Sequence, residues 1–188
     1  MAETAWIGNS PTGRTEDGAP ILLATAHLES YLGPELNQQV LAERVHQLKE
    51  TGRILAEELL RRGCAFVIFA GDMNWSDKES GDALAVLRSS GGLAQHWHDA
   101  WQSLGCPRDR KATLGGSWRL DRCYYLCAED ATSNSIGSGS RMLRPSAMDL
   151  VGREQRNGLE GMQYFTKAGK RQRLLPSDHK GLLVTFTT

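Results

Sequence analysis

The hydrophobic pattern along the chain combines short, continuous apolar runs with one long stretch of helical spacing. Residues 21–27 and 65–70 are compact apolar runs, which is typical of strands buried in a sheet. Between them, apolar residues recur at helical intervals over residues 35–62, so we predict a long amphipathic helix there. We expect Gly52 to weaken or bend this helix and Gly63 to end it.

The second half of the chain predicts further strands separated by loops. Residues 119–126 and 181–186 are apolar enough for strands, and residues 83–88 fit a short helix. The Ser/Gly-rich residues 132–140 and the polar residues 153–173 are expected to be long loops. A strand, a helix and a strand followed by more strands predict a layered mixed α/β fold.

The ends of the pattern suggest one folded unit with a loosely ordered start. Residues 1–20 are rich in Gly, Pro and polar side chains, so we expect a poorly ordered entry segment. Residues 21–188 are expected to form the folded part. The start of the chain lacks the pattern of a secretory signal, and no apolar run is long enough to span a bilayer. We therefore expect the four cysteines to be free thiols.

Charge is balanced overall and concentrated locally. The chain has 22 basic and 22 acidic residues, which gives no global field that would attract nucleic acid. Two basic clusters stand out, one at Arg108, Arg110 and Lys111 and one at Lys167, Lys170, Arg171 and Arg173. Each is either a solvated loop or a phosphate-steering surface, because each shortly precedes a string of candidate site residues.

Three short strings place polar side chains at the edges of the predicted strands. They are Gly71-Asp72-Met73-Asn74, the group around His27, Glu29 and Ser30, and Ser177-Asp178-His179. Each string alone is also what a turn would contain, because Asp and Gly are frequent turn residues. Their order along the chain is the informative feature. A serine hydrolase is excluded for want of a Gly-x-Ser-x-Gly string.

With Leu120-Asp121-Arg122, these strings resemble the endonuclease/exonuclease/phosphatase superfamily, and most closely the 5′-tyrosyl-DNA phosphodiesterase family. The resemblance implies a DNase I-like, four-layer α/β/β/α sandwich. It covers only the C-terminal half of that domain, so the sandwich is expected to be incomplete. The early Asn and the principal acidic metal ligand of the family have no counterpart before Pro20. The resemblance therefore implies poor activity for this chain alone.

The resemblance also implies a role for each candidate residue. Asp72 would accept a proton from the attacking water, Asn74 would orient it, and His179 would donate to the phosphate with its ring held by Asp121. Asp178 would contact Mg²⁺ or Mn²⁺. His27 and Ser30 would contact the scissile or terminal phosphate, and Glu29 and Trp75 would border the DNA end.

The implied activity is hydrolysis of 5′-phosphotyrosyl bonds at DNA ends during repair. The implied location is the nucleus, with the cytoplasm as a second location left open. Two alternatives stay open. One is a sibling enzyme acting on lipid, inositol phosphate or abasic DNA, and the other is a non-catalytic module that binds DNA ends or a partner.

Two departures from the family pattern bear on the substrate. Leu114 follows Thr113 where the family usually has an aromatic residue, which would weaken stacking. Residues 154–173 are longer than the family segment requires, so they are expected to reshape substrate entry.

Outside these strings, His96 and His98 flank Trp97 and could share a face, as a metal site or in packing. Trp97 and Trp101 are spaced for one face of a helix.

Overall fold

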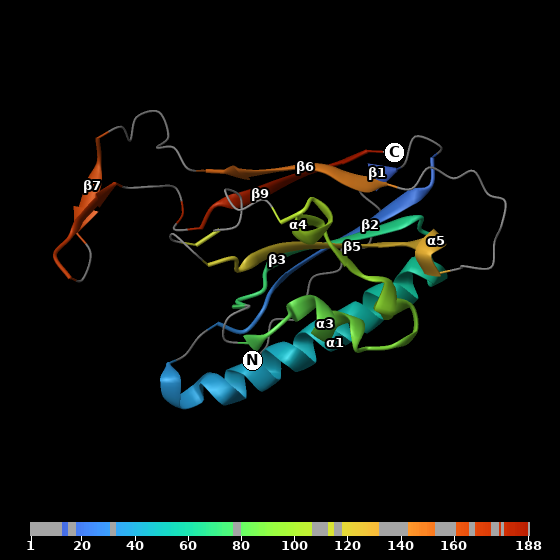
Figure 1. Ribbon diagram of the computed structural model, residues 1–188, viewed down its shortest axis with the longest axis horizontal. Helices are drawn as coiled ribbons and strands as arrows, with labels where there is room; N and C mark the ends of the chain where they lie inside the picture. Colours follow the sequence, from blue (N-terminus) through green and yellow to red (C-terminus); the bar gives the residue numbers. More distant parts are fainter. Residues whose placement is uncertain are drawn as a thin grey trace.

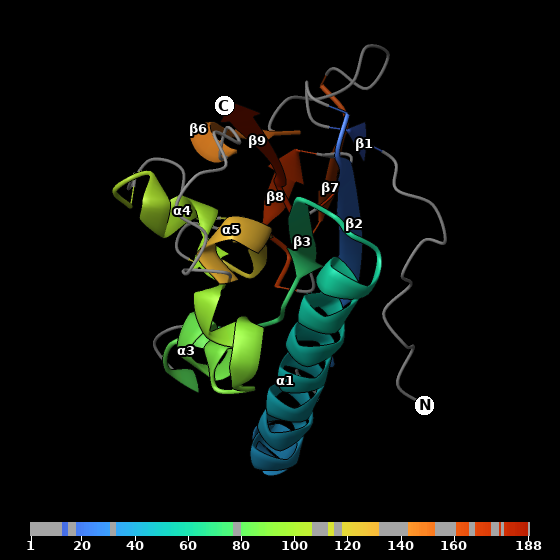
Figure 2. The same ribbon diagram turned by 90° about the vertical axis from the view of Figure 1, so that its right-hand side faces the viewer.

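The computed structural model describes residues 13–14, 18–30, 33–76, 80–106, 113–114, 118–131, 143–152, 161–165, 168–173, 177 and 179–187. In this part of the chain a helical layer, a five-stranded sheet and a two-stranded sheet lie one on another (Figures 1 and 2). These are successive layers of the predicted α/β/β/α arrangement. The predicted fold class is thus confirmed, in a partial form.

The five-stranded sheet has the order β1-β2-β3-β5-β4. Its central strands are β2 (Pro20–His27), β3 (Phe66–Asp72) and β5 (Asp121–Cys127), with β1 (Gly13–Arg14) and β4 (His98–Asp99) at the edges. Strands β2 and β3 run parallel, and β5 runs antiparallel to β3. The three strands predicted from apolar runs in this region therefore become the centre of the sheet.

The long helix α1 (Asn37–Arg61) covers one face of this sheet, after the short 3-10 turn η1 (Pro34–Leu36). Leu48, Leu55 and Leu59 on its inner side are fully buried. Helix α1 continues through Gly52, and the expected weakening or bending there stays a prediction. A Cβ at this position would lie 2.5 Å from Leu87 Cδ1, so the missing side chain lets helix α3 (Ala83–Arg88) pack close. Gly63 does end the pattern, with φ +61°.

The second sheet pairs β6 (Arg144–Val151) with β9 (Gly181–Thr187) in antiparallel fashion. Along β9, half-buried and exposed residues alternate, as in a strand with one face toward the core. Phe186 packs edge-on against Phe66 and Tyr125 of the first sheet, at ring-centroid distances of 5.4 and 5.6 Å. These aromatic contacts join the two sheets. Residues 144–151 were not predicted as a strand.

The remaining described elements are short. They are η2 (Gly92–His96), α4 (Ala100–Ser103), α5 (Ala128–Ala131), β7 (Gln163–Phe165) and β8 (Arg171–Arg173). Strands β7 and β8 form a hairpin, so the prediction of a loop throughout residues 153–173 is wrong for this part. Trp97 and Trp101 do not share a helix, because Trp97 directly follows η2 and Trp101 lies on α4.

Other sequence-based expectations have simple outcomes. The four cysteines are free thiols, as predicted. His98 donates to or accepts from Asp130 at 3.2 Å, and it stacks on Tyr125, which fits a packing role. No helix of the described residues has both the length and the apolar character needed to cross a bilayer. The basic cluster of Arg108, Arg110 and Lys111 lies outside the described residues.

The close pairing of β2 and β3 depends on Gly71. This residue has φ +149°, and a Cβ added to it would lie 2.0 Å from the carbonyl oxygen of Ala26 on the neighbouring strand. Ala26 and Gly71 are direct partners in the parallel register. Only glycine therefore allows the strands to stay together one residue before Asp72.

Gly71→Ala should consequently destabilise the protein by about 3 kcal/mol or more, because it adds a backbone clash to an unfavourable φ. Urea unfolding followed by circular dichroism measures the change. Gly92→Ala is the matched control: its φ is +55° and nothing lies within 4 Å of an added Cβ, so it should cost only about 1–2 kcal/mol. Equal losses in the two variants would contradict the role given to Gly71.

Candidate active site

Three of the predicted site residues stand in a row because of strand register. His27 is the partner of Asp72 in the β2–β3 pair, and Asp72 is the partner of Asp121 in the β3–β5 pair. The pairing is closed at this end by Leu28 N–H donating to the Asp72 carbonyl and Met73 N–H donating to the Leu120 carbonyl, both at 2.9 Å. The sheet thus sets an imidazole and two carboxylates side by side.

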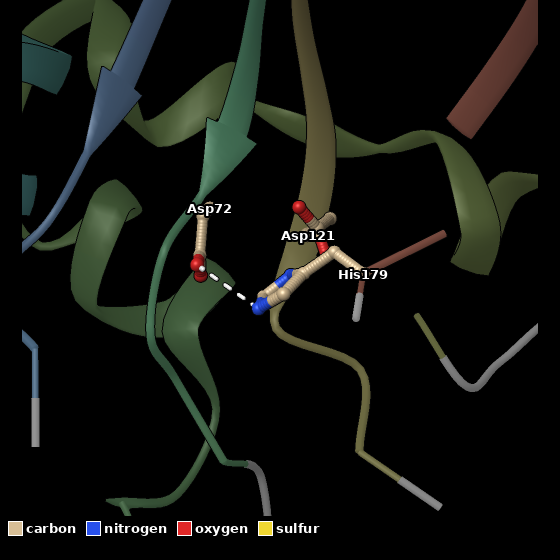
Figure 3. A group of neighbouring side chains, drawn as sticks. All are labelled: Asp72, Asp121 and His179. Atoms are coloured by element: carbon tan, nitrogen blue, oxygen red, sulfur yellow. Dashed lines mark hydrogen bonds and ion pairs between the residues drawn. The ribbon is translucent and has the colours of Figure 1, made fainter. Parts of the chain in front are cut away.

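His179 reaches the same place from the other sheet. It lies just before β9, and its backbone forms an isolated bridge with Leu114. Its Nδ1 lies 2.8 Å from Asp121 Oδ2, a hydrogen-bond distance, and its Nε2 lies 3.7 Å from Asp72 Oδ2. Figure 3 shows the ring between the two carboxylates. Because Nδ1 is held by Asp121, Nε2 is the nitrogen directed toward Asp72.

A second imidazole approaches the same carboxylate oxygen. His27 Nε2 lies 3.6 Å from Asp72 Oδ2, and 3.5 Å from the hydroxyl oxygen of Ser30. The His27 side chain is 68% exposed and that of Asp72 is 17% exposed. The site therefore has a recessed carboxylate with one open imidazole, and His179, 26% exposed, closes its other side.

Asn74 organises the chain between these groups. It has φ +45°, and its N–H donates to Asp72 Oδ1 at 2.8 Å, which fixes that carboxylate. Its side-chain Nδ2 donates to the Leu28 carbonyl at 2.8 Å and to Ser30 Oγ at 3.3 Å. The buried Arg44 of α1 donates to the Asn74 carbonyl. The amide nitrogen thus serves to hold the site together, and the predicted role of Asn74 in orienting the attacking water stays a prediction.

Thr113 is a positioning residue that the sequence analysis did not identify. It is fully buried, and its hydroxyl oxygen accepts from the N–H groups of Leu120 and Asp121, each at 3.1 Å. Its carbonyl accepts from Lys180 N–H at 2.7 Å. One residue thereby joins the start of β5, which carries Asp121, to the neighbour of His179. Only long-range contacts reveal this role, because the sequence shows an ordinary threonine.

Arg122 is a second buried support that the sequence did not indicate. Its Nη2 donates to the Trp75 carbonyl and its Nε to the Arg119 carbonyl, both at 2.9 Å. Arg119 in turn bonds Asp99 at 2.8 Å. These bonds anchor the segment that leaves β3 after Asp72, and they satisfy charges that are almost completely removed from water.

The other predicted substrate and metal residues have different outcomes. Trp75 is fully buried and donates from Nε1 to the Gly81 carbonyl at 2.8 Å, so its predicted place beside a DNA end is wrong. Its apolar surroundings make it a core residue. The N–H of Glu29 donates to Gln47 Oε1 of α1 at 3.1 Å, which fixes the backbone of the strand exit. Asp178, the predicted metal ligand, lies outside the described residues.

Asp72, Asp121 and His179 also form a group that can hold a metal ion, because their ligand atoms lie within 4.8 Å of one another. Two carboxylates and an imidazole suit a divalent cation that accepts both oxygen and nitrogen. The fit is partial. Coordination through His179 Nδ1 or the bonded oxygen of Asp121 would replace the 2.8 Å hydrogen bond that joins them.

Comparison with known proteins supports the resemblance expected from the sequence. Tyrosyl-DNA phosphodiesterase 2 of Mus musculus is 31% identical over an alignment of 181 residues, and the match covers 90% of this chain and 38% of the mouse protein. The chain is homologous to part of tyrosyl-DNA phosphodiesterase 2. Because the match covers 38% of the mouse protein, the chain spans well under half the length of that relative. No family model matches the chain.

Solved structures agree with this relationship. A humanized D. rerio tyrosyl-DNA phosphodiesterase 2 carrying 14 mutations matches 93% of this chain and 58% of its own, with a TM-score of 0.57 and 26% identity. The D. rerio enzyme complexed with a single-strand DNA product matches the same share of this chain and 59% of its own, with a TM-score of 0.54 and 23% identity. A Bacteroides thetaiotaomicron mannosyl-6-phosphatase shares the fold at a TM-score of 0.50 and 14% identity.

Thr113→Val should misplace Asp121 and His179 because it removes the shared hydroxyl and leaves two buried N–H groups without that acceptor. We expect the free energy of unfolding to fall by about 1–3 kcal/mol. We also expect the NMR signals of the His179 ring to shift. Thr113→Ser keeps the hydroxyl and should preserve both. A Val variant that loses stability but keeps the parental His179 signals would leave Thr113 with a structural role only.

Proposed function

We propose that the chain is a phosphodiesterase that acts on DNA ends and hydrolyses the bond between a tyrosine and a 5′ phosphate. The observation that carries the proposal is the approach of two imidazole nitrogens to a single recessed oxygen of Asp72, at 3.6 and 3.7 Å. Homology to tyrosyl-DNA phosphodiesterase 2 supports the substrate class. The single-strand DNA product bound by the D. rerio enzyme supports a DNA end as the ligand.

The arrangement supplies the groups that phosphodiester hydrolysis needs. Asp72 accepts a proton from the attacking water, and its orientation is fixed by the N–H of Asn74. His179 donates from Nε2 to a phosphate oxygen, while Asp121 holds the other ring nitrogen and so selects the tautomer. His27 and Ser30 bind the phosphate from the open side. Charge on the pentacoordinate phosphorus is thereby met by preorganised donors.

A divalent ion, Mg²⁺ or Mn²⁺, belongs to the same proposal. Asp178 would hold it, with carboxylate oxygens of Asp72 and Asp121 as further ligands, and it would supply charge neutralisation at the phosphate. The nuclear location implied by the resemblance stays a prediction. So does the weak activity expected of a chain that matches only one half of the family domain.

Asp72→Asn and His179→Ala should each lower the rate of tyrosine release from a 5′-phosphotyrosyl oligonucleotide by about 10²- to 10⁴-fold, because each removes a proton-transfer group. The rate is measured by chromatography of the freed oligonucleotide. His46→Ala, an exposed change on α1, is the control and should leave the rate unchanged. The parental rate also measures how active this chain is alone.

Three results would contradict the proposal. Faster hydrolysis of an inositol phosphate, a lipid phosphodiester or abasic DNA would favour a sibling enzyme. Parental rates in both site variants would show that Asp72 and His179 do not act in the reaction. Equal DNA binding by the parent and an Asp72→Asn, His179→Ala double variant, with turnover in neither, would favour a non-catalytic module.

Removal of divalent ions with a chelator should abolish hydrolysis, and added Mg²⁺ or Mn²⁺ should restore it. A second readout does not depend on turnover. Paramagnetic Mn²⁺ should broaden the NMR signals of the His179 ring in the parent, and this broadening should be lost in Asp121→Asn, which removes one ligand oxygen. Hydrolysis at full rate in the chelator would show that the reaction does not need the ion.

A further inference from the structure

The β7–β8 hairpin stands apart from the two sheets (Figure 1). In Figure 1 it extends beyond the sheets at the end where β3 stops and β5 begins, which is the end that carries the site. Apart from their mutual pairing, the two strands make no extensive contact with another described element. A lone two-stranded hairpin buries too little surface to be stable in water without help. Binding of a ligand to the hairpin would bury more of its surface and so stabilise it.

The hairpin combines an aromatic side chain with basic ones. Phe165 is 72% exposed, more than any other large hydrophobic side chain in the described residues. Its direct partner across the hairpin is the exposed Arg171, and cross-strand partners project from the same face. Over residues 161–177 the sequence has four basic residues, Lys167, Lys170, Arg171 and Arg173, and no Asp or Glu. In a chain of zero net charge, this is a concentrated positive segment.

We propose that this hairpin binds the single-stranded DNA that extends from the scissile 5′ phosphate, with Phe165 stacking on a base and Arg171 contacting phosphate. An aromatic ring beside cationic side chains is the combination by which proteins hold single strands without reading sequence. An acidic protein segment would satisfy the cations but would leave the ring exposed. The pairing of Phe165 with Arg171 therefore favours nucleic acid.

The position of the hairpin along the chain fits this ligand. Arg173, the last residue of β8, precedes His179 by six positions, which limits their separation to ~20 Å. At ~3.4 Å per nucleotide this corresponds to about 6 nucleotides. DNA whose 5′ phosphate lies at His179 would meet the hairpin within that length. The inference rests on the proposed function, because that function places the DNA end at His179.

The first test measures binding, not turnover, so that it can fail or succeed independently of the proposed reaction. The probe is a thymidine oligonucleotide of about 12 nucleotides, within the range of single-strand sites. Fluorescence anisotropy gives the dissociation constant at several salt concentrations. Lys170→Gln, Arg171→Gln should weaken binding and reduce the slope of log K against log salt by about 1.4, the value for two lost phosphate contacts. Lys49→Gln, Arg61→Gln removes two exposed charges from α1 and should change neither.

The second test separates stacking from charge. Phe165→Ala should weaken binding of the thymidine oligonucleotide by about fivefold or more. It should have no effect on an abasic oligonucleotide of equal length, which has the phosphates and lacks the bases.

The outcomes are decisive in both directions. Weaker binding in the hairpin variants alone, with a Phe165 effect that needs bases, supports the inference even if no tyrosine is released. Parental affinity in the hairpin variants overturns it, as does a parent that does not bind the oligonucleotide. An acidic peptide probe that competes fully and is insensitive to Phe165→Ala would assign the hairpin to a protein partner instead.

Discussion

The parallel pairing of β2 with β3 is the constraint on which the site depends. It holds to the last residue of both strands only because Gly71 presents no side chain to the Ala26 carbonyl. That contact fixes His27 beside Asp72, and the antiparallel neighbour then fixes Asp121 beside Asp72. A shift of one residue in the register would turn these side chains to opposite faces of the sheet. Backbone hydrogen bonding between the strands thus determines which side chains lie together at the site.

Around His27, Asp72 and Asp121, partly buried hydrogen bonds hold the loops in place. Asn74 and Arg44 tie the exits of β2 and β3 to helix α1, and Thr113 ties the start of β5 to the segment of His179. Such bonds contribute modestly when made and cost much when one partner is lost. They therefore define one conformation of the site more than they add to the overall stability.

The sequence predicted the parts of the fold that periodicity records. The apolar runs that became β2, β3, β5 and β9 and the helical spacing of α1 follow directly from burial. Strand β6 was missed because Arg144 and Pro145 open it and Asp149 interrupts it, so it has no continuous apolar run. The hairpin was missed because each of its strands has only three residues and β8 is entirely polar or basic. The packing reason for a glycine at position 52 could not be predicted from the sequence, because only the position of Leu87 in the fold shows it.

For the site, the sequence indicated Asp72, Asp121 and His179 through short strings, and the structure brings them together. Trp75 illustrates the limit of that approach. It lies next to Asn74 in the sequence, yet the chain turns after Asp72 and carries the indole into the core. Thr113 and Arg122 illustrate the reverse, since their importance comes from partners far away in the chain. A residue that lies next to a candidate site residue in the sequence therefore need not line the site in the fold.

The side chains of the candidate site come from two different sheets. Asp72 and Asp121 belong to the larger sheet, while His179 arrives with β9, whose aromatic contact with that sheet is made by Phe186 at the far end of the strand. The distances from the His179 ring to the carboxylates of Asp72 and Asp121 therefore depend on how the two sheets pack against each other. Loosening of the contact between the two sheets would separate His179 from the two carboxylates while each sheet kept its own hydrogen bonds.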